Sequence, residues 1–193
     1  MSTVGIFGGT FDPIHTGHLI TAQAVRELRR LDKIIFIPAY ISPHKTDIPT
    51  LSPRHRLEMV KLAIKNISYF NFSDIEIKAA NTSYTIETLK VLKEKHNNIE
   101  LIIGYDNILN FSTWKDPDEI LKLAKLVVLD RKLSVEPKEM DRFYSSAIFV
   151  DTPTIEISSS EIRERVYNNL PINFLVPEEV QKYIYHFNLY KEK

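Results

Sequence analysis

The sequence predicts an α/β fold in which a doubly wound parallel sheet carries helices on both faces, followed by a small C-terminal helical part. Short apolar runs alternate along the chain with segments of helical periodicity. Because these runs lack the polar alternation of half-exposed strands, they are typical of strands buried on both faces, as in parallel sheets. Ligands of such sheets bind at the carboxyl ends of the strands, so we expect a functional site there.

The first half of the chain supplies two of the expected buried strands. One apolar run ends at Gly8-Gly9 and another stops at Pro38, and both residue types interrupt regular structure. In chain order, the expected elements are a strand at residues 4–7, a helix at 17–30, a strand at 34–37, a long loop at 39–51, a helix that begins at Ser52-Pro53 and a strand at 72–78. Four apolar residues at helical spacing are expected to face inward from the first helix: Ile20, Ala24, Leu28 and Leu31.

The second half of the chain continues the alternation. The expected elements are a helix at residues 83–95, a strand at 101–103, a short helix from 116 to about 125, strands at 126–129 and 147–150, and helices that begin near 158 and 177. Two helix starts, at residues 116–119 and 158–161, have capping-box spacing. The last helix is expected to turn Val180, Ile184 and Phe187 inward. We predict a single domain over residues 1–193, with a helical appendage at about residues 170–193.

Composition narrows the class of protein. The chain has 25 basic residues (lysine and arginine) and 25 acidic residues (aspartate and glutamate), so extensive non-specific binding of nucleic acid is not expected. The chain has no cysteine, which excludes disulfides, thiolate catalysis and cysteine-bound zinc. Residues 1–11 lack a signal-peptide pattern, and no apolar stretch approaches the roughly 20 residues of a membrane span. We therefore expect a cytoplasmic protein without a membrane partner, and a homo-oligomer stays open.

One segment between the first expected strand and the first helix has the character of a phosphate site. Two adjacent glycines, Gly8 and Gly9, let the backbone approach an anion closely, and Thr10 adds a hydroxyl donor. His15 and His18 follow at the start of a helix, whose free N–H groups and dipole also attract phosphate. The segment therefore predicts binding of a polyphosphate.

Plainer interpretations of this segment exist. Two glycines after a strand can form only a turn, and two histidines three residues apart can bind a metal. No third ligand of a zinc site is visible and cysteine is absent, so no metal-ligating residue is predicted. The segment also differs from the G-x-G-x-x-G dinucleotide fingerprint and from the P-loop.

With these residues the segment resembles the signature of the nucleotidyltransferase superfamily, whose H-x-G-H motif also occurs in class I aminoacyl-tRNA synthetases. The second motif of that superfamily is present as Ile157-Ser158-Ser159-Ser160-Glu161-Ile162-Arg163. Within the superfamily, the chain is similar to bacterial nicotinate-mononucleotide adenylyltransferases over nearly its whole length. Further segments that carry this similarity are Ser42–Lys45, Ser83–Leu89, Ile103–Asp106 and Trp114. The resemblance implies a Rossmann-like sheet.

The chain departs from that family at three places. Tyr105 stands where the family commonly has alanine, and Lys115 follows the tryptophan where an aromatic residue or histidine is common. Arg131-Lys132-Leu133 replaces the usual Arg-Pro-Gly after the fourth strand. These departures bear on the acceptor and leave the expectation of adenylyl transfer unchanged.

The resemblance implies transfer of AMP from ATP to nicotinate mononucleotide, which gives deamido-NAD and pyrophosphate, with Mg²⁺ arriving on ATP. The residues that it implies for phosphate chemistry are His15, His18, Thr10, Lys45 and Arg163. The residues that it implies for substrate binding are Gly8, Gly9, Phe11, His44, Thr85, Gly104, Asp106, Trp114, Ser158 and Ser159. Among these, Gly104 and Asp106 would meet the adenosine ribose, and Trp114 would stack on the pyridine ring of a mononucleotide.

Several of these residues also have ordinary structural interpretations. Lys45 can be a solvated loop cation, Asp106 can cap a turn, and a lone tryptophan such as Trp114 usually fills a core. Arg163 can pair with Glu161 or Glu164 on its own helix. Three other functions stay open: transfer to nicotinamide mononucleotide, transfer to phosphopantetheine, and non-catalytic nucleotide binding on the same fold.

Overall fold

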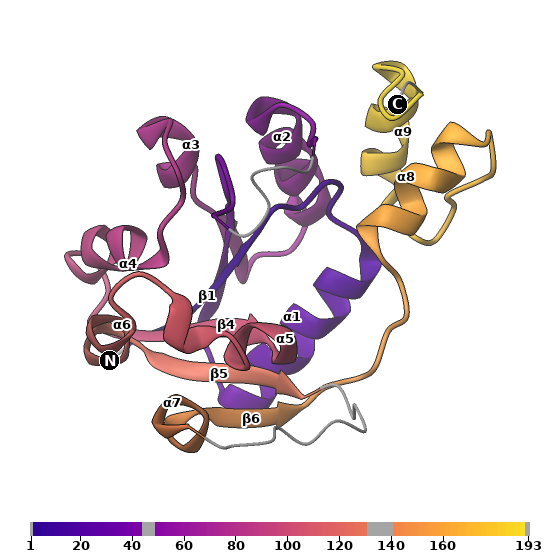
Figure 1. Ribbon diagram of the computed structural model, residues 1–193. Helices are drawn as coiled ribbons and strands as arrows, with labels where there is room; N and C mark the ends of the chain where they lie inside the picture. Colours follow the sequence, from indigo (N-terminus) through magenta and orange to yellow (C-terminus); the bar gives the residue numbers. More distant parts are fainter. Residues whose placement is uncertain (1, 44–48, 131–140, 192–193) are drawn as a thin grey trace.

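A parallel sheet of six strands forms the centre of the described part of the molecule (Figure 1). The computed structural model describes residues 2–43, 49–130 and 141–191. The strands lie in the order β3-β2-β1-β4-β5-β6, and every neighbouring pair is parallel. Their bounds are β1 Thr3–Gly9, β2 Lys33–Pro38, β3 Phe70–Phe72, β4 Asn98–Gly104, β5 Lys125–Asp130 and β6 Ile148–Asp151. This is the strand order of a doubly wound sheet, so the predicted fold class is confirmed.

Helices connect the strands and cover both faces of the sheet. Their bounds are α1 Thr16–Arg29, α2 Pro53–Ile64, α3 Ile75–Ala79, α4 Thr85–Lys93, α5 Tyr105–Ile108, α6 Pro117–Leu123, α7 Arg142–Ser146, α8 Ser159–Tyr167 and α9 Glu178–His186, with a short 3₁₀ helix, η1, at Phe111–Thr113. In the described part of the chain, no helix is both long and apolar enough to cross a membrane.

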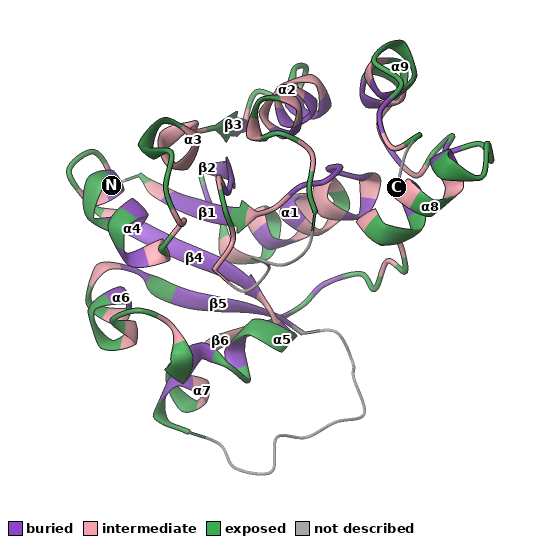
Figure 2. Cartoon of the chain, turned by 45° about the horizontal axis from the view of Figure 1, so that its top comes forward, coloured by how far each residue is buried: buried purple, intermediate pink, exposed green. Residues whose placement is uncertain are grey.

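The two faces of the sheet belong to two separate hydrophobic clusters. Successive strand residues point to opposite faces, so Ile34 and Phe36 join one cluster while Ile35 and Ile37 join the other. Helices α1, α2, α8 and α9 pack on the first cluster, and α4, α5, α6 and α7 pack on the second. Figure 2 shows the result: the strands are buried along much of their length, and the helices are exposed mainly on their outer sides.

The inward face predicted for α1 is wrong for Ile20 and Leu28, whereas Leu31, just after the helix, is buried as predicted. The helix buries Gly17, Ala22 and Val25, while Ile20 and Leu28 are 38% and 55% exposed. Ala22 and Val25 are also spaced as on one helical face, so α1 carries two apolar stripes. The stripe with the smaller side chains lies against the sheet, where it lets the helix approach closely.

The strand predicted at residues 72–78 is also wrong for most of its length. Strand β3 ends at Phe72, and α3 begins at Ile75. Ser73 ends the strand and starts the turn: its backbone N–H donates to the Phe36 carbonyl at 2.9 Å, and its Oγ accepts from the Ile75 N–H at 3.4 Å. Alternate isoleucines in a short segment fit a strand or one turn of helix equally well, so the pattern could not separate the two.

Two details of the later helices differ from the sequence-based expectation. Asp116 does precede α6, but its backbone is left-handed (φ 49°) and its side chain caps no N–H, so no capping box forms there. Phe187 lies beyond the end of α9 and is 49% exposed, whereas Val180 and Ile184 are buried as predicted. Both of these buried residues belong to the cluster that covers one face of the sheet. The single domain over residues 1–193 stays a prediction.

A buried arginine on α2 joins the loops at the carboxyl end of the sheet. The Arg56 guanidinium, in a residue 1% exposed, donates to three carbonyls: those of Thr10 (2.7 Å), Tyr40 (2.9 Å) and Leu51 (3.0 Å). Burial lowers the pKa of Arg56, and the negative charge of Asp12 opposes that effect. One side chain therefore fixes the loop after β1, the loop after β2 and the segment that leads into α2.

Replacing this arginine should destabilise the fold strongly. Arg56→Met keeps most of the buried stem but leaves three carbonyls without their donor, so we expect the free energy of unfolding to fall by about 3–5 kcal/mol. Chemical denaturation of the purified variant measures the loss. Arg54→Met, at an exposed position of the same helix, is the matched control and should stay within about 0.5 kcal/mol of the parent. A loss below about 1 kcal/mol for Arg56→Met would contradict the role of the guanidinium.

Candidate active site

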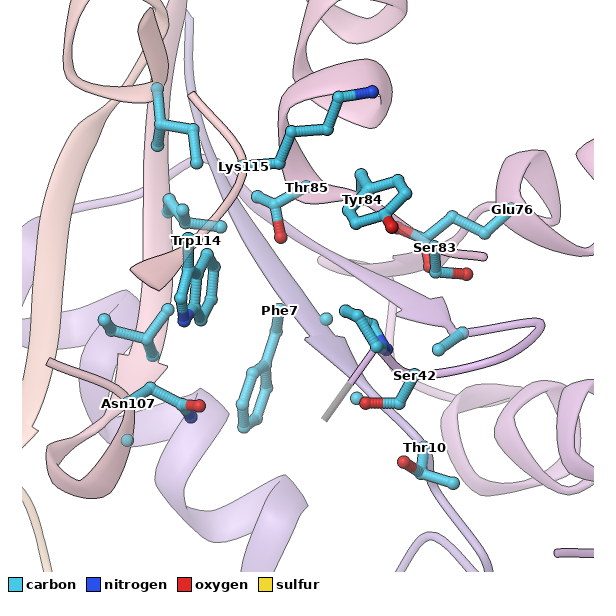
Figure 3. A pocket seen from close by; sticks show the side chains of 18 of the residues that line it. Phe7, Thr10, Ser42, Glu76, Ser83, Tyr84, Thr85, Asn107, Trp114 and Lys115 are labelled. Carbon is cyan, nitrogen blue, oxygen red and sulfur yellow. The ribbon is translucent and has the colours of Figure 1, made fainter. Parts of the chain in front are cut away.

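The strand order places a crevice between β1 and β4. The chain leaves β1 toward β2 on one side and returns to β4 on the other, so the loops after β1 and β4 diverge. β1 ends at Gly8-Gly9 and β4 ends at Gly104. A cavity of about 290 Å³ lies at this point (Figure 3). Predicted site residues that line it are Gly8, Gly9, Thr10, Thr85, Gly104 and Trp114.

The two glycines after β1 are needed for different reasons. A Cβ on Gly8 would meet no atom within 4 Å, and because Gly8 lines the cavity, any larger side chain there would take up ligand space. A Cβ on Gly9 would lie 2.9 Å from the ring of Phe11. Phe11 is buried, with a left-handed backbone (φ 50°), so the ring cannot give way easily. Gly8 thus keeps the cavity open, and Gly9 allows the turn.

The two histidines form a stacked pair at the start of α1. Their ring centroids are 3.6 Å apart with 29° between the planes. The His15 backbone N–H donates to Nδ1 of His18 at 3.2 Å, so a neutral His18 carries its proton on Nε2. A Cβ on Gly17 would lie 3.0 Å from Nδ1 of His15, so the glycine between the histidines is required for their packing. The pair therefore places two imidazole rings at the start of a helix, where the positive end of the helix dipole favours phosphate.

The second motif, at the start of α8, is hydrogen-bonded to the loop that carries the first. Ser158 caps α8 by accepting from the Glu161 N–H at 3.1 Å, as its spacing predicted. Ser159 Oγ donates to the Pro13 carbonyl at 2.9 Å, and Nη1 of Arg163 donates to the Asp12 carbonyl at 2.8 Å. The two motifs, far apart in sequence, are thus one unit in space.

The other predicted residues fall into three groups. Arg163 lines a second cavity, of about 610 Å³, on the outer side of the loop after β1. Phe11, His15, His18, Asp106, Ser158 and Ser159 line neither of these two cavities. Asp106 is exposed in the first turn of α5, and its neighbour Asn107 lines the first cavity instead. His44 and Lys45 lie outside the described residues, as does the departure at residues 131–133.

Trp114 stands on one wall of the first cavity, with Tyr84 and Thr85 on the facing side (Figure 3). Its indole packs against Phe111, with ring centroids 5.1 Å apart, and lines the cavity. Lys115 bridges the rim: its Nζ lies 3.0 Å from Oε1 of Glu87 and 4.7 Å from the centre of the Tyr84 ring. The hydrogen bond to Glu87 raises the pKa of Lys115. This cation is therefore already paired at the edge of the site.

Glu76 is a cavity residue that the sequence did not reveal, because its segment looked like a strand. Oε1 of Glu76 accepts from the Thr88 hydroxyl at 2.7 Å. Burial raises the pKa of the Glu76 carboxyl, while hydrogen bonds from Thr88 and Ser83 partly oppose the rise. Ser83 in turn accepts from the Tyr40 N–H at 2.9 Å. Glu76 thus anchors the start of α4 behind the cavity wall.

The raised pKa of Glu76 has a consequence for stability against pH. The contribution of the neutral carboxyl is complete below its unfolded pKa, about 4.3, and is lost as pH rises through the raised folded value. The side chain of Glu76→Gln cannot ionise. The melting temperature of this variant, relative to that of the parent protein, should therefore increase as pH rises from 4 to 8. Thermal denaturation across that range measures the difference.

A control of opposite sign is available on α4. The hydrogen bond from Lys115 lowers the pKa of Glu87, so the stability from Glu87 is present above its unfolded pKa and lost as pH falls. The melting temperature of Glu87→Gln, relative to that of the parent protein, should therefore decrease as pH rises. A constant difference for Glu76→Gln at every pH would show that Glu76 does not titrate as its burial requires.

Comparison with known proteins agrees with this geometry. Residues 6–165 match the model of the cytidylyltransferase-like family. A Thermoanaerobacter protein named as a probable nicotinate-nucleotide adenylyltransferase is 41% identical over 98% of this chain and 94% of its own length. A Clostridium perfringens protein with the same name is 40% identical over the full length of both. The Plasmodium falciparum nicotinic acid mononucleotide adenylyltransferase complexed with NaAD superposes with a TM-score of 0.81 over 100% of this chain and 99% of its own, at 21% identity, which supports the fold alone.

Proposed function

The chain belongs to the cytidylyltransferase-like family and, within it, to the nicotinate-nucleotide adenylyltransferases, and we propose that it transfers AMP from ATP to nicotinate mononucleotide in NAD biosynthesis. One observation carries the proposal. The glycine ends of β1 and β4 meet at the topological switch point, the two histidines start the helix that follows β1, and α8 is hydrogen-bonded to the loop between them. Sites for nucleotides in doubly wound sheets occur at such points.

The proposed chemistry is a direct displacement at the α-phosphorus of ATP. A phosphate oxygen of the mononucleotide forms a new bond to the α-phosphorus, and the bond between that phosphorus and the α–β bridging oxygen breaks. Pyrophosphate leaves with the electron pair, and the products are deamido-NAD and pyrophosphate. The attacking phosphate is already an anion near neutral pH, so no strong general base is needed. Catalysis then consists of positioning and charge stabilisation.

The residues of the two motifs suit these tasks. Thr10 and the imidazoles of His15 and His18 would donate to the reacting phosphates beside the start of α1. Arg163, tied to the same loop, would neutralise the triphosphate. Ser158 and Ser159 lie at the start of α8, where backbone N–H groups also attract phosphate. The Ser159 hydroxyl already donates to the loop, which favours a role in holding the motifs together.

We propose that Mg²⁺ reaches the site on ATP. Within residues 2–43, 49–130 and 141–191, no group of three or more histidine, aspartate and glutamate side chains could hold a metal ion. Phosphate oxygens can supply most of the ligands that Mg²⁺ prefers. When bound, the ion would neutralise phosphate charge, and the protein side chains named above would hold the nucleotide around it.

The first cavity suits the pyridine ring of the acceptor. Trp114 lines this cavity with an aromatic side chain of the kind on which a pyridine ring stacks, and α4 begins at Thr85 on the opposite wall. Backbone N–H groups at a helix start favour an anion, so a ring carboxylate fits this wall better than a neutral amide does. The alternatives, transfer to nicotinamide mononucleotide or to phosphopantetheine, differ in the group that this wall would meet.

Pyrophosphate release with ATP and a set of acceptors tests the function. We expect nicotinate mononucleotide to exceed nicotinamide mononucleotide at least tenfold in kcat/KM, because a charge-assisted hydrogen bond contributes roughly 1.5–3 kcal/mol. Phosphopantetheine should give no release. Equal efficiency with the amide would contradict the acceptor, faster release with phosphopantetheine would change the substrate class, and binding of ATP without any release would favour a nucleotide-binding protein.

His18 tests the proposed phosphate contacts. His18→Ala should lower kcat/KM by about 10²-fold, the scale of losing a donor to the transition state. Because His18 also caps α1 through Nδ1, His18→Asn serves as the control: its side-chain oxygen can accept the same N–H, but it cannot place a donor where Nε2 lies. Both variants should lose activity, and the asparagine variant should keep the parent melting temperature. Near-normal turnover in either folded variant would remove His18 from the mechanism.

A further inference from the structure

The C-terminal end of the chain reaches back to the first motif. The Tyr190 hydroxyl donates to Oδ1 of Asp12 at 2.7 Å, across 178 residues of sequence. Asp12 is 3% exposed, and its other carboxylate oxygen, Oδ2, accepts from the Leu51 N–H at 3.3 Å. Burial beside a carboxylate raises the pKa of Tyr190 far above its usual range, so the hydroxyl keeps its proton and stays a donor.

Asp12 interacts with two arginines, Arg163 of the proposed site and the structural Arg56. Nη1 of Arg163 donates to the Asp12 backbone carbonyl at 2.8 Å, and the charge of the Asp12 carboxylate acts on Arg56. The position of Asp12 therefore decides where the Arg163 guanidinium docks. Asp12, Arg163 and Tyr190 share the lining of the second cavity with the segment Pro49–Leu51.

The backbone on both sides of this contact is held in an uncommon conformation. Phe11, immediately before Asp12, has φ 50°, and Tyr190 has φ 63°. Residues with a side chain enter this left-handed region only at a cost in free energy, so surrounding contacts must fix them there. The hydrogen bond between Tyr190 and Asp12 is such a contact, and it joins strained Tyr190 to the residue that follows strained Phe11.

We propose that Tyr190 is a positioning residue for adenylyl transfer, which acts by holding Asp12 so that Arg163 docks in its working place. The inference rests on the proposed function, because Arg163 is assigned there to the triphosphate. It goes beyond that function by making the C-terminal end, which follows the last helix, part of the active-site assembly. Tyr190 touches no reacting atom in this account.

The test compares two tyrosine hydroxyls of the C-terminal part. Tyr190→Phe keeps the ring and removes only the donor to Asp12. Tyr183→Phe is the matched control, because the Tyr183 hydroxyl makes a 2.9 Å hydrogen bond with Nδ1 of His55, between α9 and α2. Circular dichroism fixes a temperature at which both variants and the parent are folded, and steady-state kinetics with ATP and nicotinate mononucleotide follow at that temperature.

We expect Tyr190→Phe to lower kcat on the order of tenfold and to raise the KM for ATP, with the KM for the mononucleotide within about twofold of the parent, because misplacing a positioned group costs rate without removing it. Tyr183→Phe should leave all three constants within about twofold. Asp12→Ala, which removes the acceptor of the Tyr190 hydroxyl, should show the same split as Tyr190→Phe. The double variant should be no worse than the more affected single variant, because the two residues act through one contact.

The outcomes separate this inference from the function on which it rests. A parent enzyme that releases no pyrophosphate contradicts the proposed function itself. An active parent with unchanged kinetics in folded Tyr190→Phe overturns the positioning role. The role is also overturned if Tyr183→Phe shows the same kinetic change, or if the effects of Tyr190→Phe and Asp12→Ala simply multiply in the double variant.

Discussion

The buried guanidinium of Arg56 is the interaction on which the site depends. Backbone carbonyls in exposed loops usually accept hydrogen bonds from water. At the carboxyl end of this sheet, three loop carbonyls instead accept hydrogen bonds from the Arg56 guanidinium, in a residue that is 1% exposed. A planar guanidinium has five N–H donors in a fixed fork, so it sets the distances among the loops it joins, which a lysine ammonium could not do. Asp12 supplies the negative charge nearby, so the cation is not left uncompensated.

The fold could be predicted for segments whose residue types are determined by burial alone. Strand β2 is apolar from Ile34 to Ile37 because side chains on both of its faces are covered, and such a run has few alternatives. The orientation of α1 was not predictable, since Ile20 and Leu28 form as good a helical stripe as Ala22 and Val25. The choice between these stripes depends on how closely the helix approaches the sheet, which is a property of the whole packing arrangement.

The site was predictable where its residues are contiguous. Gly8-Gly9 and the two histidines can be recognised in the sequence because a turn, a helix start and two imidazoles follow one another directly. Tyr190 and Arg56 carry no such local signal: a tyrosine near the C-terminus and an arginine in a helix look like surface residues until the fold brings them to Asp12 and to the loop carbonyls. Contacts across 178 residues are set by topology, and no local pattern encodes them.

The electrostatics of the acceptor wall follow from which charges are buried. Lys115 looks in sequence like a cation for a ring carboxylate, but its ammonium already pairs with Glu87 at 3.0 Å, and both side chains are about half exposed. An exposed pair contributes little and is screened by salt, so its field at the cavity is weak. The N–H groups at the start of α4 are fixed by the helix, whose first segment Glu76 anchors from behind the wall. In the proposed function, a preference for an acidic ring would therefore come mainly from the backbone of α4, and an aromatic residue or a lysine could follow the tryptophan with the same acceptor.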